Sequence, residues 1–288
     1  MLSPPVHPSP AVAAGLFGPD SVSWRVNSES ALLLGGPRAL LLQLAHPLVA
    51  AGVAAHSDFL EDPLGRLRRT LTTMLSIVFG DAATVAECAE RVVHAHIRVR
   101  GVLDEGTRAF PAGTVYDARE SRLLLWVHAT LVDSALVTYE WAVAPLADRE
   151  RAALYEESKA VARLLGVCER DLPDTYAGFR RYVDGMLGGP LAEITPTARR
   201  LARAVLQPHV SLLPPLPRLP LLPAGLGVVA ELVTAGLLPA SIRAGYGIAW
   251  DDRRAAAHRA LGRVVRAALP WLPEIVRTMP QAREAARR

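Results

Sequence analysis

Hydrophobic residues recur every three to four positions along most of this chain, the spacing that places them on one face of an α-helix. Asp62 and Pro63 supply a helix cap and a first-turn proline, Gly80 is a natural helix end, and Asp81 caps the next helix. The pattern therefore predicts two consecutive helices joined by a very short turn, then a loop and a long helix. Their expected bounds are 63–79 and 82–100 for the pair, 107–118 for the loop and 118–143 for the long helix.

The rest of the chain follows the same helical pattern, and no stretch alternates strictly between apolar and polar residues as a strand would. Pro47 disfavours the helical conformation at His46, so two helices are expected to meet there. Residues 1–24 are expected to form an irregular arm, and the proline-rich segment 208–223 an extended strap. Further helices are predicted at 147–165, 170–187, 194–206, 224–236, 251–268 and 272–286. We expect an all-α protein, with one helical domain over residues 25–288.

Composition narrows the function classes. The 288 residues carry a formal net charge of +4, and the arginines are dispersed rather than clustered, so nucleic-acid binding is not expected. The two cysteines form neither a disulfide framework nor a zinc-finger spacing, which favours a reducing compartment. Nucleotide-binding glycine motifs, a serine nucleophile elbow and the ExxH pairs of di-iron bundles are absent from the sequence.

One apolar stretch bears on localisation. Residues 221–240 are long and hydrophobic but are interrupted by Pro223, Glu231 and Pro239, whereas a spanning helix needs about 20 apolar residues with few charges. A buried or membrane-surface helix is favoured. With no signal-peptide pattern at the N-terminus, we expect a cytoplasmic protein that touches membranes peripherally through residues 210–240.

Histidines are the candidates for chemistry. On the 82–100 helix His96 falls in the middle of the apolar face, whereas His94 falls on the opposite face with charged residues. On the 122–139 stretch His128 faces inward and Asp133 is expected near the far side. His46 and His56 flank a short helix and could reach a cavity at either end. Helical periodicity alone does not choose between His96 and His128, and a lone inward histidine is more often structural.

A polar stripe runs beside the apolar face of the 63–79 helix. Arg66 and Thr70 lie four residues apart on one side, with Ile77 on the same flank. An arginine and a threonine at the edge of a core can hold dioxygen, a carboxylate or a propionate. The alternative is a surface arginine that extends past a threonine to water.

Five segments together resemble one protein family. They read GPRALLLQLAHPLVAAGVAAHSDF, DPLGRLRRTLTTMLSIVFG, HIRVRG, LLLWVHATLVDSAL and GLLPASIRAGYGIAWDD. The chain resembles, over roughly residues 25–285, the bacterial family related to the catalytic domain of latex-clearing protein, a rubber oxygenase, and to the fungal oxygenase MpaB. This resemblance implies an all-helical fold with a globin-like core that holds haem b through a histidine.

The resemblance also implies site residues. The distal RxxKT pattern of the rubber oxygenase falls on Arg66, Arg69 and Thr70, with an arginine in place of the lysine. The H-x-x-V-x-G placement of the axial ligand falls on His96. The chain departs from the pattern upstream, where VAAGVAA has no counterpart of the distal glutamate.

These observations predict a haem b-dependent oxygenase that uses dioxygen on a lipophilic, isoprenoid or alkene-like substrate, with oxidative cleavage of a C=C bond as one outcome. Three alternatives stay open. The first is a haem-binding sensor or carrier, and the second is a cofactor-free helical binder of hydrophobic ligands. The third is a non-haem metal enzyme that uses His46, His56 and His128 together.

Overall fold

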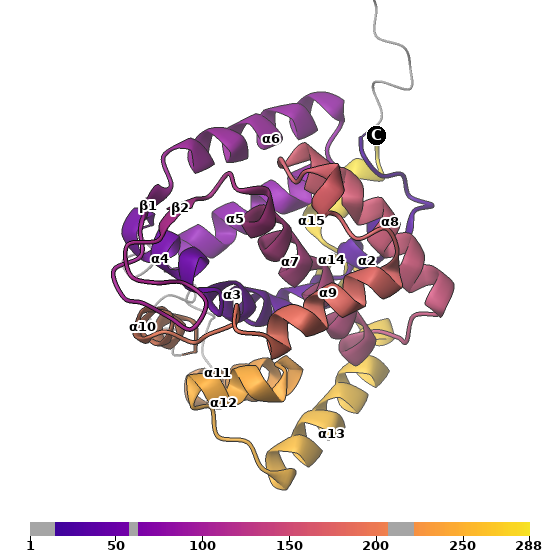
Figure 1. Ribbon diagram of the computed structural model, residues 1–288. Helices are drawn as coiled ribbons and strands as arrows, with labels where there is room; N and C mark the ends of the chain where they lie inside the picture. Colours follow the sequence, from indigo (N-terminus) through magenta and orange to yellow (C-terminus); the bar gives the residue numbers. More distant parts are fainter. Residues whose placement is uncertain (1–14, 58–62, 207–221) are drawn as a thin grey trace, which may run out of the picture.

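The chain folds into helices around one long central helix, in a computed structural model that describes residues 15–57, 63–206 and 222–288 (Figure 1). The all-α prediction is confirmed, apart from a small two-stranded sheet in the described part of the chain. The elements, in chain order, are α2 Val22–Ser28, η1 Ser30–Gly35, α3 Gly36–Leu44, α4 Pro47–His56, α5 Pro63–Phe79, α6 Ala82–Ile97, β1 Arg100–Val102, β2 Val115–Asp117, α7 Ser121–Ala142, α8 Asp148–Leu164, η2 Glu169–Asp171, α9 Tyr176–Gly188, α10 Pro196–Leu206, α11 Leu222–Leu237, α12 Ala240–Tyr246, α13 Asp252–Ala268, η4 Leu269–Trp271, α14 Glu274–Arg277 and α15 Pro280–Ala285.

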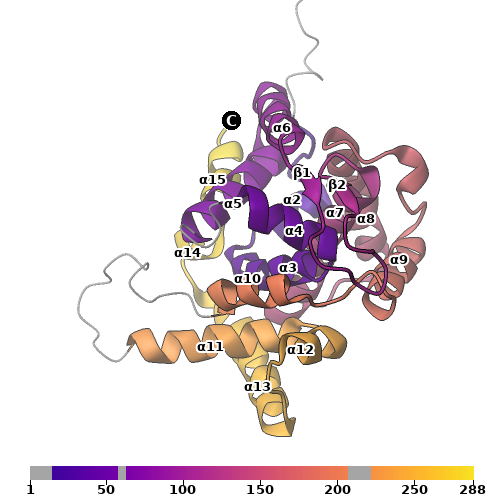
Figure 2. The ribbon, with the colours of Figure 1, turned by 60° about the vertical axis from the view of Figure 1, so that its left-hand side comes forward.

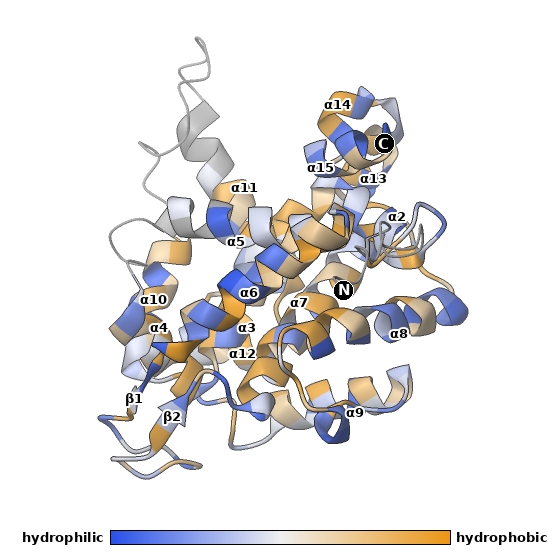
Figure 3. Cartoon of the chain, turned by 90° about the horizontal axis from the view of Figure 1, so that it is seen from above, coloured by the Kyte–Doolittle hydropathy of each residue, from blue (hydrophilic) through white to orange (hydrophobic). Residues whose placement is uncertain are grey.

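Helix α7 is the centre of the core. Its 22 residues pack against η1, α3, α8, α9 and α13, and it buries residues on every side, including Trp126, Ala129 and Thr138. A helix that is apolar nearly all round is stable only when neighbours cover it on all sides. Figure 3 shows hydrophobic residues along α7 and more hydrophilic ones on the outer helices α6 and α8. Close approach to η1 requires Gly35, because a Cβ there would lie 2.2 Å from Thr138 Oγ1.

Helices α3 and α4 meet at His46, as Pro47 predicts. His46 has an extended backbone, with φ −87° and ψ 119°. The helical segments on its two sides, Ser30–Leu44 and Pro47–His56, make an angle of 106° with each other. Within the described residues, no single helix has both the length and the apolar character to cross a membrane. The bent pair of Ser30–Leu44 and Pro47–His56 passes that test only when its halves are taken together.

Helices α5 and α6 form the predicted consecutive pair, and the Asp81 carboxylate caps α6 by accepting from the Thr84 amide at 2.8 Å. The predicted end of α6 at residue 100 is wrong. The helix ends at Ile97, and Arg100–Val102 pairs antiparallel with Val115–Asp117 inside the predicted loop. Three-residue strands are too short to show alternation, so their pairing is decided by the tertiary structure.

The C-terminal part also differs from expectation. The single helix predicted at 272–286 is broken into α14 and α15, because the Met279 amide donates to the Ser28 carbonyl at 2.8 Å, and Pro280 then starts a new helix. Helix α2 begins at Val22, inside the stretch predicted to be irregular, and the short α12 was not predicted. Residues 1–14 of the arm and 208–221 of the strap lie outside the described residues.

Candidate functional site

Two neighbouring cavities lie between the α5–α6 pair and the central helices. The first, the α5 cavity, has a volume of about 210 Å³ and lies where α5 faces η1, α3 and α7. Its lining is mostly leucine, methionine and valine, and its polar groups include Gln43, Thr70 and Ser134. It can therefore hold an apolar molecule and offer it a few hydrogen bonds.

The second, the His96 cavity, has a volume of about 190 Å³. Helices α4 and α7 and strand β2 supply mainly aliphatic side chains and Tyr116, while His56 and His96 supply ring nitrogens. Gln43 lines both cavities, so it stands between the two spaces.

His96 lines its cavity, as the helical wheel predicts, and His94 is exposed on the other side of α6. Burial lowers the pKa of His96 below its ordinary value, while the nearby Asp117 carboxylate acts in the opposite direction. His96 is therefore neutral at pH 7 and keeps a ring nitrogen lone pair, which a metal ligand requires.

The other candidate histidines lie in different places. His128 is buried in α7 beside a third, smaller cavity of about 80 Å³, the His128 cavity, and burial lowers its pKa to about 4. His46 is also buried, beside the ring of Phe110, with a pKa lowered by burial to about 4. In the described part of the chain, His128 Nε2 and His46 Nδ1 have no hydrogen-bond partner. His56 Nε2 lies 3.0 Å from the Arg100 carbonyl oxygen.

These histidines do not form a joint metal site. Across residues 15–57, 63–206 and 222–288, no three His, Cys, Asp or Glu side chains gather closely enough to hold a metal ion. The arrangement of His46, His56 and His128 therefore gives no support to the non-haem metal centre considered from the sequence. A haem ligand needs a single histidine, so His96 and His128 both remain candidates.

Helix α5 carries the predicted distal residues. Thr70 is exposed at its surface and lines the α5 cavity, and Arg69 is exposed. Arg66 lies one turn before Thr70, but its side chain is outside what the structure describes. The placement of Ile77 on the flank is wrong, because its side chain is fully buried in the cluster with Phe17.

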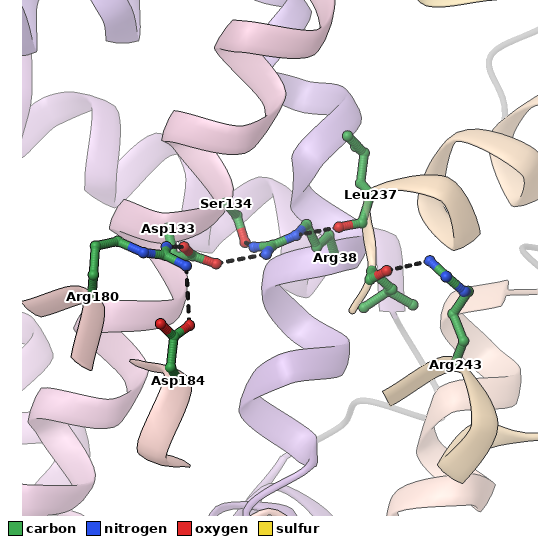
Figure 4. Close-up of polar contacts among 8 residues, drawn as sticks. Arg38, Asp133, Ser134, Arg180, Asp184, Leu237 and Arg243 are labelled. Carbon is green, nitrogen blue, oxygen red and sulfur yellow. Dashed lines mark hydrogen bonds and ion pairs between the residues drawn. The ribbon is translucent and has the colours of Figure 1, made fainter. Parts of the chain in front are cut away.

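A buried charge network lies next to the α5 cavity and was missed at the sequence level. Asp133 was expected near the far side of its helix, yet it is only 2% exposed. Arg38 on α3 donates from Nη2 to Asp133 at 2.6 Å and from Nη1 to Ser134 Oγ at 2.7 Å (Figure 4). Arg180 on α9 donates to the second oxygen of Asp133 and, at 3.2 Å, to the exposed Asp184.

The same arginine also reaches α11. Arg38 Nε donates to the Leu237 carbonyl at 2.8 Å, at the end of that helix (Figure 4). The guanidinium of Arg38 thus links α3, α7 and α11. The carboxylate of Asp133, which also accepts from Arg180, connects these helices to α9. Because Ser134 both accepts from Arg38 and lines the α5 cavity, the network fixes one wall of that cavity.

Comparison with known proteins identifies a family but no individual relative. The profile of a family described as "ER-bound oxygenase mpaB/B'/Rubber oxygenase, catalytic domain" matches residues 24–267, which is most of the chain. No curated protein and no solved structure gave a match.

Proposed function

The chain belongs to the family of mpaB-type and rubber oxygenase catalytic domains, and we propose that it is a haem b-dependent oxygenase of a lipophilic substrate. Because the members of this family are oxygenases, the expected reactants are a small-molecule substrate and dioxygen. The observation that carries the finer proposal is the position of His96, half-buried, neutral and facing a mainly aliphatic cavity. A neutral imidazole in such a setting is the usual protein ligand of haem iron.

The size and lining of the cavities fit a haem when the two are taken together. Pockets that enclose flat organic ligands have volumes of about 300–1,000 Å³. Each cavity alone is smaller, at about 210 and 190 Å³, whereas both together reach this range. A haem held by His96 would draw on the space on both sides of Gln43.

The residues then have separate tasks. His96 would hold the iron, and the haem when bound would supply the binding and activation of dioxygen. Thr70 presents a hydroxyl at the edge of the α5 cavity, where it can donate a hydrogen bond to a polar group of the substrate. The leucine and methionine side chains around it exclude water and suit an isoprenoid or other alkene, for which oxidative C=C cleavage is the proposed reaction. Arg66 and Arg69 are the proposed basic residues on the same helix.

An absorbance spectrum tests the proposal directly. Protein purified from cells supplied with a haem precursor is expected to show a Soret band, with about one haem b and one iron per chain. Oxygen uptake that depends on an added alkene would then establish turnover. A colourless protein that also fails to bind added haemin would refute the haem proposal.

Gln43 offers a second test, because it lines both cavities. Gln43→Trp is expected to fill the space between the cavities and to lower haem affinity at least about fivefold, since overpacking a binding space costs about 1–3 kcal/mol. Gln43→Leu, of similar volume, is the control and is expected to retain haem. Equal haem content in both variants, measured by pyridine haemochrome, would show that a haem does not span the two cavities.

A haem-binding sensor or carrier is the second candidate, and a specific observation favours it. No aspartate or glutamate lines the α5 or His96 cavity among the described residues, so no carboxylate base stands ready there. This agrees with the absence of a carboxylate in VAAGVAA. A protein with a Soret band but without substrate-dependent oxygen uptake, across a panel of alkenes, would support the carrier.

A further inference from the structure

Exposed hydrophobic side chains gather on neighbouring elements at one side of the molecule. Helix η1 packs against both α11 and α14, and η4 leads directly into α14. Figure 2 shows α5, α11, α14 and α15 together on the left-hand side. We call the following eight exposed residues the apolar face: Leu33 and Leu34 of η1, Val228 and Val229 of α11, Trp271 and Leu272 at η4, and Ile275 and Val276 of α14.

The exposure of these side chains is unusually high. Trp271 is 88% exposed, and Ile275 and Val228 are each 67% exposed. Single exposed hydrophobic residues are ordinary, but eight of them on elements that neighbour η1 indicate a contact surface. Tryptophan in particular is enriched where a protein meets the headgroup region of a lipid bilayer.

The charge of the adjoining segment indicates which partner fits. Residues 252–288, which include α13, η4 and α14, contain nine arginines and three acidic residues. This excess of six positive charges exceeds the net +4 of the whole chain, so the remainder carries a net charge of −2. Arg253, Arg259 and Arg263 are exposed on α13. A segment that carries exposed apolar residues and an excess of arginines matches an anionic membrane surface, where the headgroups attract arginine and the acyl boundary accepts the apolar side chains.

The α5 cavity adjoins the apolar face at Leu33. Leu33 belongs to the apolar face and also lines the cavity, and exposed Thr70 lines it from α5. Met279, two residues after α14, lies in the cavity wall from the same side. An apolar molecule that leaves a bilayer beneath this face would reach the cavity without crossing water.

We propose that the apolar face docks on an anionic lipid membrane and that the α5 cavity opens toward the acyl chains. The docking surface extends beyond the 210–240 segment expected from the sequence, because η1, η4 and α14 take part in it. Of that segment, the structure describes residues 222–240. This inference goes beyond the proposed function and does not require haem.

Vesicle flotation tests the docking surface. The full chain is expected to float with vesicles of phosphatidylcholine containing phosphatidylserine, and less with phosphatidylcholine alone or at high salt. Trp271→Ser combined with Ile275→Ser is expected to weaken partitioning at least about tenfold, because two large apolar side chains no longer enter the bilayer. Both positions are exposed, so the fold is expected to persist, which circular dichroism checks.

A matched control uses exposed residues elsewhere. Val93→Ser combined with Val115→Ser changes side chains on α6 and β2, which are 40% and 69% exposed. This variant is expected to bind vesicles as the unmodified chain does. Subtracting the emission spectrum of Trp271→Phe from that of the unmodified chain leaves the emission of Trp271. This difference spectrum is expected to shift to the blue when vesicles are added.

Two results would overturn the proposal. One is vesicle binding that is absent or equal in the two double variants. The other is that the unmodified chain binds no vesicles but forms a dimer, seen by light scattering, that is lost in Trp271→Ser/Ile275→Ser. That result would make the face an interface between two copies. Neither result depends on the Soret band, so failure here and failure of the haem proposal are distinguishable.

Discussion

Asp133→Asn is expected to lower the free energy of unfolding by about 3–5 kcal/mol, the usual cost of removing one charge from a buried ion pair. The Arg38 side chain is 3% exposed and would lose the charge of its main partner, while its Nε and Nη1 donors stay fixed on the Leu237 carbonyl and on Ser134. Urea unfolding followed by circular dichroism measures the change, with the m value checked for two-state behaviour.

Asp184→Asn is the matched control. Asp184 also accepts from Arg180, but its side chain is 66% exposed, and exposed ion pairs contribute about 0–1 kcal/mol. Its replacement is expected to change the free energy of unfolding by less than about 0.5 kcal/mol. If Asp133→Asn costs no more than this control, the network does not hold the α3, α7 and α11 junction together.

His96→Ala has the largest expected effect on the proposed function. The variant is expected to keep its fold and to lose at least about nine-tenths of its haem, because His56 is the only other histidine that lines the His96 cavity among the described residues. His56 Nε2 is already within 3.0 Å of the Arg100 carbonyl and is poorly placed to replace His96. Haem content after purification, from the Soret band and pyridine haemochrome, gives the result.

Two further histidine variants make this test specific. His94→Ala changes an exposed side chain two residues away and is expected to retain haem. His128→Ala removes the buried alternative, whose Nε2 has no partner among the described residues. If His128→Ala loses haem and His96→Ala retains it, the residue that would hold the iron is His128 and not His96.

Local sequence signals placed much of the fold correctly. Pro47 positioned the bend at His46, Asp81 positioned the start of α6, and the spacing of apolar residues placed His96 inward and His94 outward. These features depend on residues within one or two helical turns, because capping, proline geometry and helix amphipathicity are local effects. The resemblance to the family agrees with the match over residues 24–267.

Features that depend on distant partners were not recoverable in the same way. Asp133 falls near the far side of its helix on a helical wheel on which the face of His128 points inward, so it was expected away from the core. Its burial is possible only because Arg38 and Arg180, 95 and 47 residues away in the sequence, converge on it. The β1–β2 pair and the break at Met279 likewise follow from contacts between separate segments.

The sequence by itself thus determined the helical class, most helix bounds, the family and the inward histidines. Only the tertiary structure decided that His96 and Thr70 line adjoining cavities, that Gln43 stands between these, and that η1, α11, η4 and α14 bring their exposed side chains to one side. The physical reason is that helix formation is governed by neighbours in sequence, whereas a cavity, a buried ion pair or a surface patch exists only where separate helices pack.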